Sequence, residues 1–225
     1  VAGRPLPEAL LAENPDEVHQ GGDNLRKQLA NMQLHGVTPV VAINAFPGDH
    51  RADLDAIAEI ASEYGARAAI TTHFADGGAG AATLAEAVKE AAAEPSDFQV
   101  LYPDDMSLAA KIETVATKVY GADGIELSPT ARRQLDTYTA AGFDHLPVCI
   151  AKTHLSISSD PTLKGAPTGW TLPVREVRAS VGAGFVYPIC GDMRTMPGLG
   201  RTPAAKGIDL VFDDDNPDGR IVGLS

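Results

Sequence analysis

Residues 39–44 read Pro-Val-Val-Ala-Ile-Asn, a short apolar run that suits a strand buried on both faces. A loop over residues 45–50 leads to a predicted helix at residues 53–64, which has apolar side chains at helical spacing and Gly65 after it. Residues 68–72, Ala-Ala-Ile-Thr-Thr, predict a second strand. This strand–helix–strand order is typical of parallel strands joined by a crossover helix.

The pattern continues on both sides of this unit. An extended, Pro-containing stretch is expected first, followed by a helix that begins near Asp23, places Leu25, Leu29 and Met32 on one face, and ends at Gly36. The later predicted elements are a flexible loop at 76–80, a helix at 83–93, a strand at 98–101, helices at 107–120 and 128–140, a strand at 146–151, and β-rich runs at 171–178 and 184–189.

The predicted fold class is therefore α/β, with a parallel sheet flanked by helices and a β- and loop-rich C-terminal lobe. We expect three parts: a segment and helix at 1–36, an α/β region with ligand loops at its strand ends at 37–151, and the lobe at 152–225. The boundary between the α/β region and the lobe is set at residue 152, because Gly and Pro become frequent there and helical periodicity disappears.

Composition limits the classes of function. A chain of 225 residues with 44% hydrophobic residues can bury a core, and the lack of an 18-residue apolar run argues against a membrane partner. The net charge of −12 argues against a nucleic-acid partner. Cys149 and Cys190 lie far apart in apolar runs, which favours two small buried hydrophobes, no disulfide, and a cytoplasmic location.

Two predicted strand ends carry one aromatic residue each. Phe46 lies in the loop at 44–49 and Phe74 in the loop at 73–78, at the carboxyl ends where α/β sheets bind ligands. Two such rings can hold a flat heterocycle between them, with each ring contributing roughly 1 kcal/mol beyond burial. The alternative is that both rings cap the hydrophobic core of the sheet.

Other chemical motifs are weak or missing. The sequence contains neither GxxxxGK[ST] nor GxGxxG, and Asp76 beside the Gly-rich turn would repel phosphate. The six histidines are scattered, so no metal site is predicted. His73 and His154 are either acid–base groups or ordinary structural histidines, and Lys152 either meets an anionic substrate or forms a surface salt bridge.

Several long stretches resemble formate–tetrahydrofolate ligases, and they occur in the same order as in that family. They are PVVAINAFPGD (39–49), YGADGIELSPTA (120–131), LPVCIAKTHLSIS (146–158), TGWTLPVREVRASVGAGFVYPICGDMRTMPGL (168–199) and GRIVGLS (219–225). The resemblance runs from about residue 24 to residue 225.

The resemblance implies the C-terminal part of a P-loop-type ligase whose N-terminal body, with the ATP loop and the catalytic residues, lies before Val1. It implies ATP-dependent ligation of formate to tetrahydrofolate through formyl phosphate, with Mg-ATP held mainly by residues absent from this sequence. A monovalent cation and a homo-oligomer are further expectations from the family. The rival hypothesis is a non-catalytic folate-binding or assembly subunit.

Carried over residue by residue, the resemblance places the folate ring between Phe46 with Pro47 on one side and Phe74 on the other. It places Gly165, Ala166 and Pro167 near the adenine. Three positions depart from the family pattern: Phe74 stands where Trp is usual, Asp76 where Lys is usual, and Ala45 where Arg is usual. These departures remove two positive charges near the ring and add a negative one.

Overall fold

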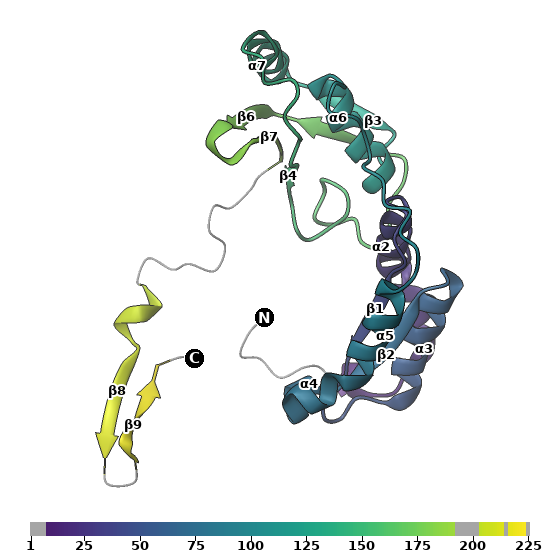
Figure 1. Cartoon of the computed structure of the whole chain (residues 1–225), viewed down its shortest axis with the longest axis vertical. Coiled ribbons are helices and arrows are strands. Elements are labelled where there is room, and N and C mark those ends of the chain that lie inside the picture. The colour runs from purple at the N-terminus through teal and green to yellow at the C-terminus, as the bar shows by residue number, and fades with distance from the viewer. Residues whose placement is uncertain (1–7, 192–202, 214–215, 224–225) are drawn as a thin grey trace. The chain divides into compact units, whose positions relative to one another are not determined.

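The computed structural model describes residues 8–191, 203–213 and 216–223, and the chain forms two compact units, 1–192 and 193–225 (Figure 1). The α-helices of the first unit are α1 (Pro15–Gly21), α2 (Asp23–Gln33), α3 (Arg51–Glu63), α4 (His73–Asp76), α5 (Ala82–Ala92), α6 (Leu108–Thr114) and α7 (Pro129–Ala140). Its strands are β1 (Val40–Asn44), β2 (Arg67–Thr71), β3 (Gly124–Leu127), β4 (Ala151–Lys152), β5 (Thr171–Val174), β6 (Glu176–Ser180) and β7 (Phe185–Cys190). Shorter turns are the 3-10 helices η1 (Glu8–Leu11), η2 (Gly77–Ala81) and η4 (Val181–Ala183) and the π-helical η3 (Val115–Val119).

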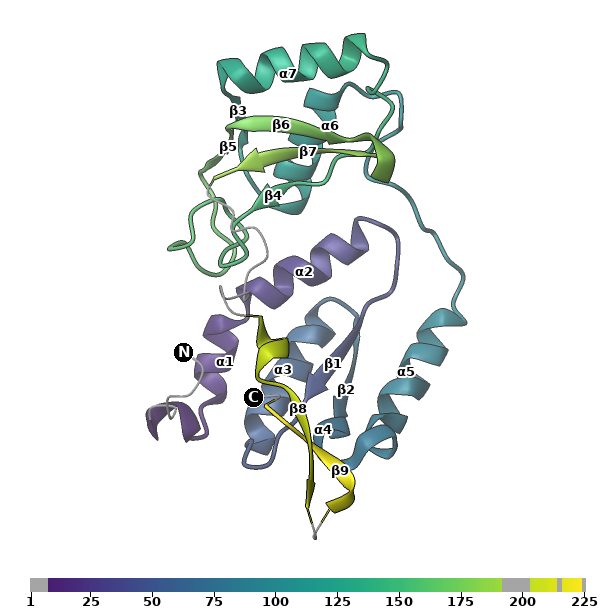
Figure 2. The same cartoon turned by 90° about the vertical axis from the view of Figure 1, so that its left-hand side faces the viewer.

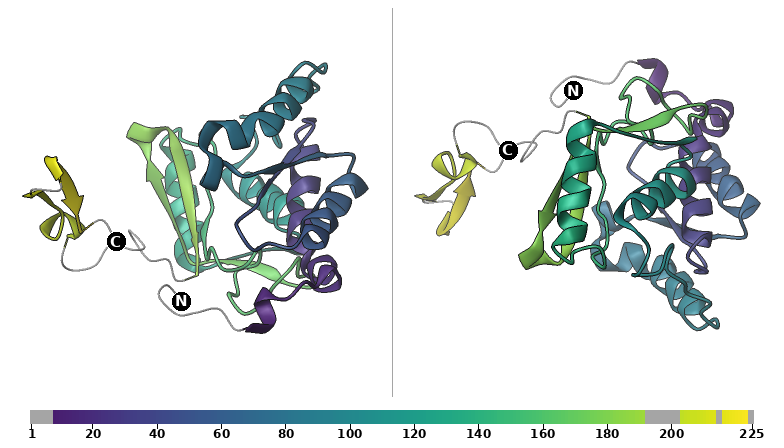
Figure 3. Two further views of the ribbon diagram at one scale, coloured as in Figure 1. Left: turned by 90° about the horizontal axis from the view of Figure 1, so that it is seen from below. Right: turned by 90° about the horizontal axis from the view of Figure 1, so that it is seen from above.

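Strands β1 and β2 are parallel and in register from Val40 opposite Arg67 to Asn44 opposite Thr71. Helix α3 connects them, as predicted, and packs with α2 against one face of the pair around Leu29. The expected burial of β1 on both faces is wrong: Ala42 and Asn44 are exposed. Helix α5 packs mainly against β2, lies at the outer edge of this unit and has no buried residue (Figure 3).

The first helix was not expected, because the stretch before Asp23 was predicted to be extended. Pro15 occupies the first turn of α1, and the Asn14 side chain caps it by accepting from the Glu17 N–H at 3.2 Å. The apolar face of α2 is also narrower than predicted: Leu29 is buried, but Met32 is 46% exposed. Helix α2 is therefore only partly covered within this unit.

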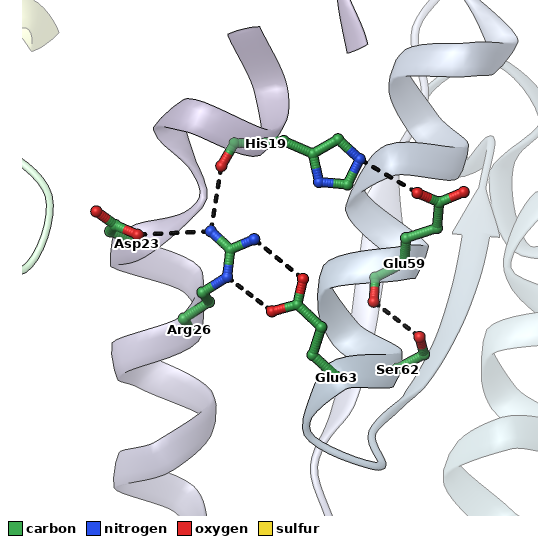
Figure 4. A network of polar contacts seen from close by, with 6 residues as sticks. All are labelled: His19, Asp23, Arg26, Glu59, Ser62 and Glu63. Atoms are coloured by element: carbon green, nitrogen blue, oxygen red, sulfur yellow. Dashed lines mark hydrogen bonds and ion pairs between the residues drawn. The ribbon is translucent and has the colours of Figure 1, made fainter. Parts of the chain in front are cut away.

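Ion pairs hold α1 and α2 against α3 (Figure 4). Arg26 of α2 donates to both carboxylate oxygens of Glu63, at 2.7 and 3.0 Å, and also to the carbonyl oxygen of His19. The hydrogen bond from Arg26 holds the pKa of Glu63 below its usual value. A bidentate pair of this kind fixes the orientation of α2 on α3 as well as adding energy.

The second half of the first unit contains two further small sheets. Strands β3 and β5 pair in parallel, while β7 pairs in parallel with β4 and antiparallel with β6 (Figure 2). Helices α6 and α7 pack on these strands around one core, whose fully buried members include Leu108, Ile112, Ala131, Leu172, Val174, Val177 and Val186. The α/β class is confirmed, but three small sheets replace the single parallel sheet that we predicted.

Several local predictions were wrong. The loop at 76–80 is helical, because α4 passes directly into η2. The strand at 98–101 is irregular, and its Phe98 and Val100 are 63% and 67% exposed. Only the end of the strand at 146–151 is regular, as β4, and β3 was missed. The P-loop-type ligase architecture and the three-part division of the chain stay predictions.

Lys111 of α6 is fully buried and connects two loops. Its ammonium donates to the carbonyl oxygens of Asp104 and Asp144, both at 2.7 Å, and of Leu146 at 3.1 Å, and it lies 5.9 Å from the ring centroid of Tyr102. Burial lowers the pKa of this lysine. The three carbonyl groups compensate for the lost hydration of the ammonium, and in return they are fixed by it.

The second unit is described by itself. Its regular elements are the 3-10 turn η5 (Ala204–Lys206) and an antiparallel hairpin of β8 (Asp209–Asp213) and β9 (Asn216–Val222). Leu210, Phe212 and Ile221 of this hairpin are 48%, 63% and 58% exposed. Across both units, the described helices include none that is long and apolar enough to cross a membrane.

Candidate ligand site at the ends of two parallel strands

The parallel register of β1 and β2 brings the two predicted ligand loops together. Asn44 and Thr71 are partners at the last position of the pair, and the Ala45 N–H extends the pairing by donating to the Thr71 carbonyl oxygen at 3.0 Å. The chain then continues from both strands at the same edge, to Phe46 on one side and Phe74 on the other. The sheet topology alone therefore makes these two side chains neighbours.

The two rings contact each other and are open to solvent. Their centroids are 5.1 Å apart with the planes tilted by 55°, and Phe46 and Phe74 are 49% and 70% exposed. Side chains that capped the core would be buried, so the core-cap alternative does not fit. A planar ligand between two rings needs roughly 7 Å from ring to ring, two stacking distances of about 3.5 Å. The rings must therefore separate before a heterocycle can enter.

The loop that carries Phe46 is a fixed turn. The Phe46 N–H donates to the Asp49 carboxylate at 2.8 Å, and the Asp49 N–H donates back to the Phe46 carbonyl oxygen at 3.1 Å. Gly48 has φ +101°, a conformation that side chains rarely adopt. Pro47 lies inside this turn and is exposed. Asp49 thus has a structural role in holding the backbone that presents Phe46.

The segment that carries Phe74 is held by the hydroxyl groups of Thr71 and Thr72. The Thr71 hydroxyl donates to the Gly80 carbonyl oxygen at 3.1 Å and lies 3.1 Å from His73 Nδ1, and the Thr72 hydroxyl donates to the Asp76 carboxylate at 2.6 Å. Gly80 is required here, because an added Cβ would lie 2.7 Å from the Thr72 carbonyl carbon. Asp76 therefore closes the first turn of α4, which gives a local reason for an acidic residue at this position.

The immediate surroundings of the rings are acidic. Residues 45–50 and 72–80 contain Asp49 and Asp76 but no lysine or arginine. The next cation along the chain, Arg51, donates to Asp55 at 2.8 Å. These loops therefore offer aromatic surface to a neutral ring and little attraction to an anion.

The loop predicted to lie near adenine is elsewhere in the first unit. A Cβ at Gly165, which has φ +70°, would be 3.5 Å from the Asp23 side chain, and the Pro167 carbonyl oxygen accepts from Trp170 Nε1 at 3.0 Å. Ala166 between them is exposed. This loop lies beside α2, whereas α4 with Phe74 lies at the other end of β1 and β2 (Figure 2). The structure does not bring the two predicted groups together.

In the described part of the chain Lys152 forms no surface salt bridge, and its other role considered from sequence, contact with an anionic substrate, stays a prediction. Its ammonium donates to the carbonyl oxygens of Thr153, Ser156 and Ser158 and lies 4.8 Å from the Tyr120 ring centroid. No carboxylate pairs with it in the described part of the chain, so it is not a surface salt bridge. Burial lowers its pKa.

The two cysteines differ. Cys190 is fully buried, as expected of a small hydrophobe, and burial raises the pKa of its thiol to about 12. Cys149 is exposed, contrary to the prediction, and both thiols are unbridged.

The two candidate histidines differ in their contacts. His154 is exposed, whereas His73 forms a hydrogen bond with Thr71.

Sequence reasoning missed a second group of polar residues, on α2. Asn24, Gln28 and Asn31 line a cavity together with Tyr120 and Lys152. The available signal was three carboxamides at positions i, i+4 and i+7, which lie on one face of a helix.

Comparison with known proteins places these observations in a family. The sequence model described as formate–tetrahydrofolate ligase matches residues 1–225. The chain is 64% identical, over its whole length, to a protein named formate–tetrahydrofolate ligase from Saccharopolyspora erythraea, of which it covers 39%. It is 56% identical to formate–tetrahydrofolate ligase 3 of Rubrobacter xylanophilus (99% of the chain, 40% of that protein) and 54% identical to the ligase of Cutibacterium acnes (100% and 39%). The chain thus spans about two fifths of the length of these curated relatives.

Proposed function

The chain belongs to the formate–tetrahydrofolate ligase family, and from this membership we propose that it supplies the folate-facing part of an enzyme that joins formate to tetrahydrofolate. In the proposed reaction, ATP and formate give formyl phosphate. N10 of tetrahydrofolate then attacks the formyl carbon and phosphate leaves, giving 10-formyltetrahydrofolate and ADP. This reaction needs positioning and charge stabilisation more than a protein nucleophile.

The observation that carries the proposal is the exposed pair of Phe46 and Phe74. A phenylalanine side chain presents about 200 Å² of area, so the two exposed fractions correspond to about 100 and 140 Å². Covering half of each with a flat ring contributes about 1–2 kcal/mol per ring at 25 cal/mol per Å². We propose that the pterin-like ring of the folate lies between them, with Pro47 extending the Phe46 side.

The proposed reaction also needs ATP with magnesium. The described residues hold no group of three or more His, Cys, Asp or Glu side chains that could bind a metal. The sequence also lacks a phosphate loop. We therefore propose that Mg-ATP is held mainly by residues outside this chain, with Gly165, Ala166 and Pro167 of this chain on the adenine side. The proposed monovalent cation rests on the family resemblance alone, and the proposed cytoplasmic location rests on the two widely spaced cysteines of the sequence.

A homo-oligomer is also proposed. Its support is the apolar surface of the β8–β9 hairpin, where Leu210, Phe212 and Ile221 are each about half exposed or more. Two-stranded hairpins are at best marginally stable alone in water, so this surface is expected to be covered in the assembled protein.

The test is substitution of the two rings. Phe46→Ala and Phe74→Ala should each weaken tetrahydrofolate binding about 5- to 30-fold, the equivalent of 1–2 kcal/mol. Phe98→Ala is the matched control, because Phe98 is 63% exposed but stacks on His35, away from these loops. Unchanged affinity in both loop variants, measured by calorimetry on folded protein, rules out the stacking role.

The rival function, a folate-binding subunit without turnover, is favoured by the acidic loops and the absent phosphate loop. The two proposals differ in one measurement. Formate-dependent release of ADP from ATP, in the presence of tetrahydrofolate and the complete assembly, supports the ligase. Folate binding without that release supports the rival.

A further inference from the structure

A polar cavity lies between α2 and the segment that follows β4. It has a volume of about 290 Å³ and is lined by Asn24, Gln28 and Asn31 of α2, by Tyr120, and by residues 152–157. The π-helical turn η3 (Val115–Val119) ends at its wall. Single π-helical turns inside helices are rare and occur often at functional sites. Nothing in the proposed folate site uses these residues.

The cavity is locally cationic in a chain of net charge −12. None of its lining residues is acidic. The Lys152 ammonium in its wall is held only by carbonyl oxygens, which leave its charge without a counter-ion among the described residues. Lys27, on the same face of α2 as Asn24, also donates only to a carbonyl oxygen, that of Lys118 at 2.9 Å. Two positive charges without carboxylate partners favour an anion here.

The carboxamides supply both kinds of hydrogen-bonding group. Asn31 donates through Nδ2 to Gln28 Oε1 at 3.3 Å, which leaves the Gln28 amide nitrogen and the Asn24 side chain without partners in the described part of the chain. Asn31 is 8% exposed, and its Oδ1 is buried with no hydrogen-bond partner. An orphaned acceptor of this kind costs about 1–3 kcal/mol, and a donor on a ligand removes that cost.

We propose that this cavity binds inorganic phosphate. The amide donors of Asn24 and Gln28 match its unprotonated oxygens, the positive charges of Lys152 and Lys27 attract it, and the Asn31 Oδ1 matches the proton that phosphate retains near neutral pH. Sulfate has the same shape but no proton, so it leaves the Asn31 oxygen unpaired. A phosphate monoester has lost most of its proton at about pH 7, since its second pKa is about 6. The proposal is independent of the folate site, because it uses none of the same residues.

The first experiment is calorimetric titration of the full chain with phosphate, sulfate and a simple phosphate monoester at about pH 7 and constant ionic strength. We expect a phosphate dissociation constant on the order of 0.1–1 mM and binding of the other two anions at least about tenfold weaker. Equal affinity for phosphate and sulfate overturns the role of Asn31. Tighter binding of the monoester shows that an esterified phosphate is the ligand and overturns the assignment to inorganic phosphate.

Variants locate the site. Lys27→Met should weaken phosphate and sulfate equally, by about 5- to 10-fold, whereas Asn31→Leu should abolish the preference for phosphate. Lys89→Met is the matched control, because Lys89 is exposed on α5 and pairs with Glu86. If circular dichroism shows that Asn31→Leu does not fold, Lys27→Met still decides, because the Lys27 ammonium is bonded to the carbonyl oxygen of Lys118, next to the lining residue Val119. Phosphate affinity unchanged in Lys27→Met, or absent below about 10 mM in the parent chain, overturns the proposal.

Discussion

Replacing the buried Lys111 by methionine should be among the most destabilising single changes in this chain. The side chains are similar in length, but methionine cannot donate, so the carbonyl oxygens of Asp104, Asp144 and Leu146 lose their shared donor. Each hydrogen bond to a charged group contributes about 1.5–3 kcal/mol, and the removed cost of burying the ammonium offsets part of the sum. We expect a net loss of about 3–5 kcal/mol, because each of the three carbonyl groups left buried without a donor costs about 1–3 kcal/mol and the removed cost of burying the ammonium is subtracted from their sum.

The assay is urea unfolding of the purified chain, with Lys89→Met as the control. Lys89 is exposed, with its ammonium 3.0 Å from Glu86, so its replacement should change the free energy of unfolding by less than about 0.5 kcal/mol. A domain near the lower end of the ordinary range of stability, about 5–15 kcal/mol, would keep little of its free energy of unfolding after the Lys111→Met change. A loss below about 1 kcal/mol would refute the reasoning, since it would mean that water satisfies the three carbonyl groups.

Two further predictions concern the packing of α2. The pKa of Glu63 is lowered by the hydrogen bond from Arg26, so this pair stabilises the fold above the usual glutamate pKa of about 4.5 and ceases to do so as pH falls through the lower folded value. The stability difference between the parent chain and Glu63→Gln, followed by urea midpoints, should therefore shrink below about pH 4; a difference that grows in acid would contradict it. Gly36→Ala should cost about 2 kcal/mol or more, because Gly36 has φ +66° and its added Cβ would clash with the Asp97 carbonyl oxygen. Gly65→Ala is the control, with φ +64° and no atom within 4 Å, and equal losses in the two variants would show that the contact with Asp97 relaxes freely.

Local patterns in the sequence predicted those elements that are determined by nearby residues. The strand at 39–44 and the helix at 53–64 were found because hydrophobic spacing and a closing glycine define them. Helix α7 was found because Ser128 and Pro129 are a strong start signal, and the Ser128 side chain accepts from the Ala131 N–H at 3.0 Å. The contact between Phe46 and Phe74 followed from parallel pairing alone.

The sequence-based predictions failed where contacts between distant parts of the chain decide the local structure. Phe98 and Val100 have the composition of a strand, but no partner strand is available to them in the described structure, so the segment is irregular. Strand β3 was missed because its four residues are stabilised by pairing with β5, far along the chain. The cavity beside Asn31 could not be predicted, because its walls come from α2 and from residues 119–157, which only the fold brings together.

The central claim, that the folate ring lies between Phe46 and Phe74, is tested most directly by titrating the chain with tetrahydrofolate while following phenylalanine ring signals by NMR. The two rings lie 5.1 Å apart and must separate to admit a ligand, so the signals of both should shift together and saturate, while those of Phe98 stay unchanged. Saturable folate binding that leaves the Phe46 and Phe74 signals in place would contradict the account.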